Sequence, residues 1–105
     1  MNGTKKRLRL ATNASKRQRK LWAAYWGQEE IIAFAEPSQY WSHMWTVYFD
    51  GMPEEAINRV AAACVKAEPG LRSHEESVRL LRIYGVAIGQ QWLVIEDIQE
   101  EGGAL

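Results

Sequence analysis

The fold is decided by residues 41–66, WSHMWTVYFDGMPEEAINRVAAACVK. The segment Trp41–Phe49 combines aromatic and β-branched residues in an alternating order, which predicts a strand. Asp50–Glu55 then supplies a turn, a proline and two acids suited to the positive end of a helix dipole. The helix that follows, through Lys66, carries an apolar stripe with the spacing i, i+3, i+4, i+7. A strand followed by an amphipathic helix predicts the α+β class.

The sequence beyond this stretch continues the alternation of elements. Glu68-Pro69-Gly70 interrupts the chain, and Ser73 and Glu76 have capping-box spacing at the start of a helix that ends at Tyr84, before Gly85. Val86–Ile88 and Trp92–Ile98 then predict either a β-hairpin or one bent strand. The second run is apolar on both faces, which fits a strand buried on both sides or paired centrally with the strand at 45–49.

The N-terminal third predicts one helix and one ambiguous segment. Thr12 or Asn13 can cap a helix through Trp26, which ends at Gly27. Residues 28–35 fit a short helix or a buried strand, because periodicity does not separate the two at this length, and we favour a helix. Glu36-Pro37-Ser38 ends this segment, since the residue before proline is driven out of the helical region.

The expected organisation is therefore a small single α+β domain. About three helices pack on a short antiparallel sheet over residues 13–99. Residues 1–12 are expected to be a flexible basic arm and residues 100–105 a frayed tail. A chain of 105 residues with 47% hydrophobic residues is long enough to bury one core.

The strongest signal in the composition is a charge split. The first twenty residues contain eight basic residues and no acidic residue, whereas residues 21–105 contain five basic and thirteen acidic residues. Two surfaces of opposite sign predict partners of different charge. The basic residues are Lys5, Lys6, Arg7, Arg9, Lys16, Arg17, Arg19 and Lys20.

Five tryptophans are more than a small core requires. Large rings most often fill the core, but tryptophan and arginine also anchor interfaces, so at least one ring is expected at a contact surface. Trp22 and Trp26, next to the basic cluster, are the predicted contact residues. They join the eight cations as the candidate site for a partner or nucleic acid.

Residues that would support catalysis or cofactor binding are not clustered in the sequence. His43, His74 and Cys64 lack ligand spacing, and the glycines form no phosphate loop, so we expect no metal and no cofactor. Cys64 lies in the stripe of an Ala-rich helix, which favours packing over nucleophilic chemistry. The paired acids at helix starts interact favourably with the positive end of the helix dipole, so they need no catalytic role to explain them. We therefore expect no enzymatic activity. One cysteine and no apolar run of signal or membrane-span length predict a cytoplasmic protein without a membrane partner.

Residues 13–21, NASKRQRKL, resemble the arginine-rich RNA-hairpin-binding peptides of phage antitermination proteins. The resemblance covers nine of the 105 residues and implies RNA binding by a cationic helix. The remainder of this chain departs from that family, because it is apolar and predicted to fold.

Two hypotheses of function follow from these observations. The first is a non-enzymatic interaction factor of the phage or mobile-element accessory type. Such a protein docks on a host protein that handles nucleic acid, such as RecBCD, a helicase or a CRISPR effector, and modulates or inhibits it. The alternative is direct DNA or RNA binding through the basic arm and first helix.

Overall fold

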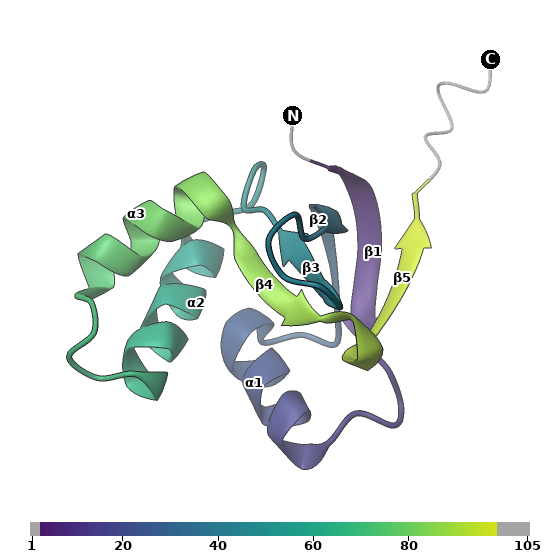
Figure 1. Cartoon of the computed structure of the whole chain (residues 1–105), viewed down its shortest axis with the longest axis horizontal. Coiled ribbons are helices and arrows are strands. Elements are labelled where there is room, and N and C mark those ends of the chain that lie inside the picture. Colours follow the sequence, from purple (N-terminus) through teal and green to yellow (C-terminus); the bar gives the residue numbers. More distant parts are fainter. Residues whose placement is uncertain (1–2, 99–105) are drawn as a thin grey trace.

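The computed structural model describes residues 3–98 and contains three α-helices and a five-stranded antiparallel sheet (Figure 1). This arrangement confirms the predicted α+β class. The predicted tail at 100–105 lies outside the described residues. In chain order the elements are β1 (Thr4–Leu10), α1 (Lys16–Trp26), β2 (Glu30–Pro37), β3 (Met44–Val47), α2 (Glu54–Ala67), α3 (His74–Tyr84), β4 (Val86–Gly89), a 3₁₀ helix (Gln90–Trp92) and β5 (Leu93–Asp97).

The sheet is strongly curled. Its strand order is β4-β3-β2-β1-β5, so β4 and β5 occupy its opposite edges. A 3₁₀ helix of only three residues nevertheless joins these two edges. Backbone hydrogen bonds at this end run from Gln90 to the His43 carbonyl, at 2.8 Å, and from Ala11 to the Trp92 carbonyl, at 2.9 Å. The sheet therefore closes toward a barrel at this end.

The predicted arm at residues 1–12 is wrong, because Thr4–Leu10 form β1 between β2 and β5. Leu8 is fully buried and lies opposite Ile31 of β2 and Ile95 of β5. Basic residues hide an alternating strand pattern here, since Lys5, Arg7 and Arg9 share the face opposite Leu8. A charged outer face is compatible with a strand whose inner face is in the core.

The helix favoured at residues 28–35 is also wrong, because Glu30–Pro37 form β2. Ile31, Ala33 and Ala35 are buried, and their neighbours along the strand are more exposed. This two-residue period is that of a strand with one face in the core. Ala33 and Ala35 on that face are small and only weakly apolar. The alternation of apolar and polar residues that distinguishes a strand from a helix is therefore weak in the sequence.

Neither prediction for the last two strands is correct. β4 pairs with β3, whereas β5 pairs with β1, so they form neither a hairpin nor one bent strand. β5 is an edge strand and is only partly buried, which also excludes the predicted central pairing with the strand at 45–49. The predicted strand at Trp41–Phe49 is confirmed over its middle, as β3 covers Met44–Val47.

The helix boundaries follow capping chemistry. α1 begins after Ser15, whose hydroxyl accepts a 3.1 Å hydrogen bond from the Gln18 backbone, so neither Thr12 nor Asn13 is the cap. The predicted capping box of α3 is confirmed. The Ser73 hydroxyl accepts from the Glu76 backbone, and the Glu76 carboxylate accepts from the Ser73 backbone, both at 3.1 Å. Hydrogen bonding to Ser73, above all from its backbone N–H, lowers the pKa of the Glu76 carboxylate below its usual value.

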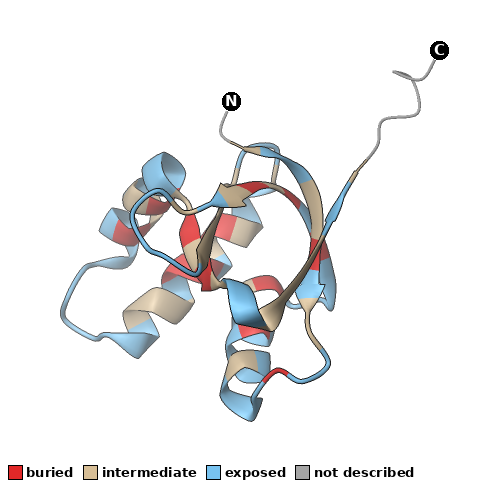
Figure 2. Ribbon diagram, turned by 45° about the vertical axis from the view of Figure 1, so that its right-hand side comes forward, coloured by how far each residue is buried: buried red, intermediate tan, exposed pale blue. Residues whose placement is uncertain are grey.

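The core lies between the inner face of the curled sheet and the three helices (Figure 2). Leu8, Val47 and Val60 are fully buried at its centre. Trp22 and Trp26 pack edge to face, with ring centroids 6.2 Å apart, and Trp26 also lies against Phe49. The aromatic residues of α1 thus hold that helix against the sheet.

The two buried tryptophans of α1 differ in hydrogen bonding, and this difference predicts unequal effects of phenylalanine substitutions. The Trp22 indole N–H donates to the Gln28 carbonyl at 2.9 Å, whereas the buried Trp26 indole N–H has no partner among the described residues. Trp22→Phe breaks a hydrogen bond, while Trp26→Phe removes an unpaired donor. We expect Trp22→Phe to be the more destabilising by about 1 kcal/mol in urea unfolding. A larger loss for Trp26→Phe would contradict this hydrogen-bonding pattern.

Candidate functional site

The structure divides the eight predicted cations between β1 and α1. On β1, Lys6 forms an ion pair with Asp97 of β5, and the Arg7 Nε lies 3.4 Å from the Glu30 carboxylate of β2. Each pair links β1 to a neighbouring strand, so Lys6 and Arg7 are paired within the sheet. The β1 cations are Lys5, Lys6, Arg7 and Arg9, and the α1 cations are Lys16, Arg17, Arg19 and Lys20.

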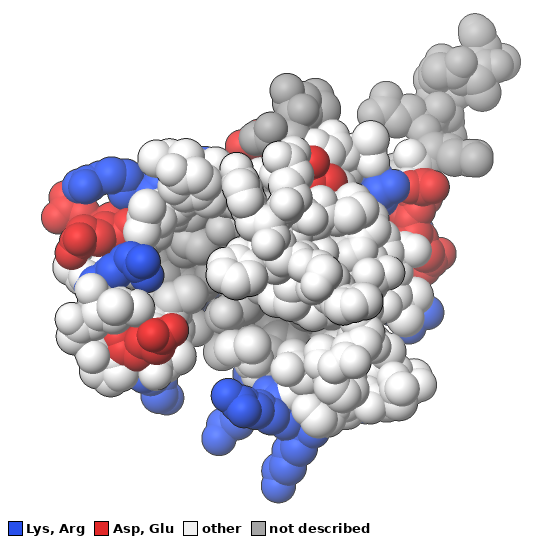
Figure 3. All heavy atoms as spheres, viewed as in Figure 1, with Lys and Arg blue, Asp and Glu red and all other residues white. Residues whose placement is uncertain are grey.

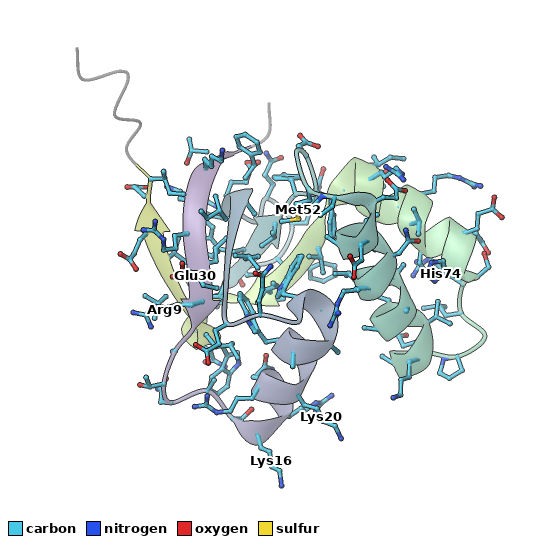
Figure 4. All side chains as sticks on the ribbon, turned by 180° about the vertical axis from the view of Figure 1, so that it is seen from behind. Arg9, Lys16, Lys20, Glu30, Met52 and His74 are labelled. Carbon is cyan, nitrogen blue, oxygen red and sulfur yellow. The ribbon has the colours of Figure 1, made fainter. Side chains whose placement is uncertain are left out.

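The α1 cations form the more open basic surface. Lys16, Arg17 and Lys20 are exposed, and no ion pair is recorded for them within residues 3–98. Figure 4 shows Lys16 and Lys20 pointing away from the body of the protein, at a distance from Arg9. Arg19 differs from these three, because its guanidinium donates to the Thr12 carbonyl and ties α1 to the preceding loop. We call Lys16, Arg17 and Lys20 the α1 basic cluster.

One hollow brings three of the predicted residues together. Arg9, Arg19 and Trp22 line a space of about 520 Å³ between the end of β1, α1 and the loop that precedes β2. Glu29 lines the same space and offsets part of the basic charge. Trp22 contributes little exposed surface there, since it is 6% exposed. The hollow is therefore lined by charges of both signs and is not a dedicated anion site.

The predicted contact role of Trp22 and Trp26 does not fit their positions. Each is 6% exposed and belongs to the core, so neither ring can stack on a base or enter a partner without leaving it. The exposed tryptophan is instead Trp41, at 64%. Trp41 is thus the tryptophan that reaches the surface, in a loop rather than in the first helix, and its role at a contact surface stays a prediction.

Exposed aromatic side chains gather around a second hollow of about 570 Å³ on the outer face of β3 and β4. Tyr40, Trp41 and Tyr84 are 81%, 64% and 61% exposed, and Ile83 is 57% exposed. Large apolar side chains grouped on a surface mark binding sites more often than isolated ones do. We name this hollow the docking groove. It is lined by Ser38, Gln39, Tyr40, Trp41, Thr46, Tyr48, Ile83, Tyr84, Gly85 and Ala87.

Two uncharged runs of sequence form the docking groove. Residues 37–49 and 83–95 contain no Lys, Arg, Asp or Glu, and the pairing of β3 with β4 places the two runs side by side. The space-filling view shows a correspondingly broad uncharged area on this side of the molecule, with basic residues below it and residues of both charges at its left and right (Figure 3). The two uncharged runs are separated by 33 residues in the sequence. They are a sequence signal of the groove, but clusters of charged residues do not reveal it.

The loop that carries Tyr40 and Trp41 is held by hydrogen bonds. The Ser38 hydroxyl accepts from the backbone N–H groups of both residues, at 3.2 and 3.1 Å. The Ser38 backbone donates to the Met44 carbonyl at 2.9 Å and closes the base of the loop. His43 adopts a left-handed conformation with φ of 62°, which is uncommon outside glycine. These contacts fix the backbone of the loop from which the two exposed rings project.

The other wall of the docking groove depends on Gly85. This residue ends α3 with φ of 72°, and its backbone N–H donates to the Leu81 carbonyl at 2.9 Å. A Cβ atom at this position would lie 2.5 Å from the Val47 carbonyl oxygen. Glycine therefore lets the end of α3 approach β3 closely and places Ile83 and Tyr84 beside the strand.

Acidic groups border the docking groove. The Tyr48 hydroxyl donates to the Glu36 carboxylate at 2.9 Å, and Glu36 lies opposite Thr46 in the β2–β3 pairing. Partial burial, the hydrogen bond to Glu36 and the nearby negative charges of Glu36 and Asp50 raise the pKa of Tyr48 to about 12. The charged residues that act on this tyrosine are thus both acidic.

Two findings concern groups that could hold a metal ion or act as a nucleophile. Within residues 3–98, no three His, Cys, Asp or Glu side chains lie close enough to hold a metal ion. Burial raises the pKa of the Cys64 thiol, which lowers the fraction of reactive thiolate at neutral pH. Of the helices described, none has the length and apolar character needed to cross a bilayer.

Comparison with known proteins gives no relative, since no protein-family model, curated protein or solved structure matches this chain.

Proposed function

We propose that this chain is a non-enzymatic interaction factor that docks on another protein through the docking groove. The observation that supports this most is the group of Tyr40, Trp41 and Tyr84, all more than 60% exposed, on two uncharged segments. Tryptophan and tyrosine are the residues that most often dominate binding energy at protein interfaces. A monomer gains nothing in stability from exposing them together.

The partner we propose is a host protein that handles nucleic acid, such as a nuclease, a helicase or a CRISPR effector, in the cytoplasm. The α1 basic cluster supports this choice, because it offers positive charge on a different element from the groove. A partner that carries DNA or RNA presents both a protein surface and a phosphate backbone. On this proposal the groove holds the protein and α1 lies toward the nucleic acid, so that binding modulates or inhibits the partner.

Direct DNA or RNA binding is the second candidate, and the α1 basic cluster favours it. Lys16 and Arg17 stand in the first turn of α1, which contains no acidic residue and whose dipole disfavours cations. Their presence there has no benefit for the helix. Contact with phosphates would account for them without any protein partner.

Affinity capture from a host lysate, with and without nuclease treatment, separates the two candidates. The leading proposal predicts that one host protein is retained after the nucleic acid is digested. Direct binding predicts that capture is lost on digestion, and that bare DNA or RNA shifts in a gel with a steep dependence on salt. Retention of nucleic acid alone would refute the leading proposal.

Alanine substitution of the α1 basic cluster should separate binding from stability. We expect the triple variant Lys16→Ala, Arg17→Ala, Lys20→Ala to reduce the salt slope of nucleic-acid binding by up to about 3 on a log–log plot. Its melting temperature should stay the same or rise slightly, because cations that oppose the helix dipole are removed. Arg19 is left in place, since it ties α1 to Thr12. A marked fall in melting temperature would show that the cluster is structural.

A further inference from the structure

The docking groove combines aromatic faces with negative potential. Tyr40, Trp41, Tyr48 and Tyr84 all line it, and each ring carries partial negative charge on its faces. A cation placed over such a ring is attracted electrostatically, and the attraction is stronger where water is excluded. Several rings around one hollow therefore favour a cation over an anion.

Two further features give this groove the same preference. The carboxylate of Glu36 is bound to the Tyr48 hydroxyl at its border, and the structure records no ion pair for Glu36 among residues 3–98. α3 ends at Tyr84 in the wall of the groove, so the negative end of its dipole is directed there. The faces of the rings, the Glu36 carboxylate and the end of α3 all carry negative charge toward the groove.

We propose that the docking groove receives an arginine side chain from an extended basic segment of the partner protein. This inference rests on the proposed function and specifies what the groove recognises. Arginine fits better than lysine, because a planar guanidinium stacks on aromatic faces while its N–H groups donate to a carboxylate. Phosphate is disfavoured at this site by the negative charge of Glu36, which is bonded to Tyr48. The docking groove thus contacts a basic segment of the partner, while the α1 basic cluster faces an anion elsewhere.

The test uses two labelled peptides of equal length, nine arginines and nine citrullines, with the whole chain. Citrulline keeps the planar shape of the arginine end group, but a carbonyl oxygen replaces one nitrogen, so citrulline has fewer N–H donors and no charge. At physiological salt, fluorescence anisotropy should show the arginine peptide binding about tenfold more tightly or better, from a difference of about 1.4 kcal/mol. Equal binding of both peptides would overturn the inference.

Charge-neutral variants separate recognition by rings from general attraction. Trp41→Ala and Tyr84→Ala leave the net charge unchanged and should each weaken the arginine peptide about fivefold. Leu71→Ala, at an exposed leucine outside the groove, should have no effect. If all three variants bind as the unaltered chain does, the attraction is diffuse and the inference fails.

The role of Glu36 is tested by a pair of variants with the same change in charge. Glu36→Gln should weaken the arginine peptide about threefold or more, whereas Glu55→Gln on α2, outside the groove, should have little effect. Equal losses in the pair would contradict a specific contact. If the arginine peptide fails to bind while Trp41→Ala still abolishes partner capture, the inference is wrong and the docking function stands.

Discussion

Leu8→Ala is expected to lower the free energy of unfolding by about 2–5 kcal/mol, the usual cost of removing a large aliphatic side chain from a core. Leu8 is fully buried on β1, between Ile31 of β2 and Ile95 of β5. The loss is a large share of the roughly 5–15 kcal/mol that stabilises a small domain. Urea unfolding followed by far-UV circular dichroism measures it.

Lys5→Ala is the control for this prediction. Lys5 is exposed and points to the opposite face of the same strand, so its replacement should change stability by less than about 0.5 kcal/mol. If Leu8→Ala were as mild as Lys5→Ala, residues 4–10 would not be a strand of the sheet. The N-terminal residues would then be the flexible arm that their charge suggests.

Trp41→Ala is expected to abolish or strongly weaken partner binding, by about 2 kcal/mol or more, which is roughly a thirtyfold loss of affinity. Trp41 is 64% exposed in the loop between β2 and β3, so the folded domain loses little when its ring is removed. The melting temperature should therefore stay nearly unchanged. Titration of the purified partner by calorimetry, with thermal melts of the same samples, checks both statements.

Leu71→Ala is the matched control, because Leu71 is a similarly exposed apolar residue in the loop between α2 and α3, outside the docking groove. It should leave both affinity and melting temperature unchanged. Equal affinity losses at Trp41 and Leu71 would mean that exposed apolar area in general, rather than the groove, drives binding. A sharp fall in melting temperature for Trp41→Ala would assign the ring a structural role.

The sequence predicted the elements of the fold better than their pairing. The helix from 54 onward and the capping box at Ser73 depend on local spacing and capping chemistry, which a single sequence contains. The pattern of β1 is weak because Lys5, Arg7 and Arg9 alternate with Leu8 and Leu10, whereas Lys6 puts a further cation on the face of the two leucines and obscures the two-residue period. The separation of β4 from β5 follows from the curl of the sheet, which is a tertiary property.

In the candidate site, too, local features could be predicted from the sequence, whereas contacts between distant segments could not. Proximity in sequence grouped Trp22 and Trp26 with the cations of α1, but those cations occupy the outer side of the helix and the rings its inner side. Trp41 was assigned to a strand, although it precedes β3 in a loop. The docking groove combines residues from two distant segments, and only the pairing of β3 with β4 brings them together. Their shared lack of charge was present in the sequence from the start.

Co-purification from nuclease-treated host lysate tests most directly whether the docking groove holds the partner. Three proteins are compared: the unaltered chain, the double variant Trp41→Ala, Tyr84→Ala, and the triple alanine variant of Lys16, Arg17 and Lys20. If the docking groove holds the partner, the double variant loses the host protein while the triple variant retains it, with all three folded by circular dichroism. Retention by the double variant and loss by the triple variant would contradict it and assign binding to α1.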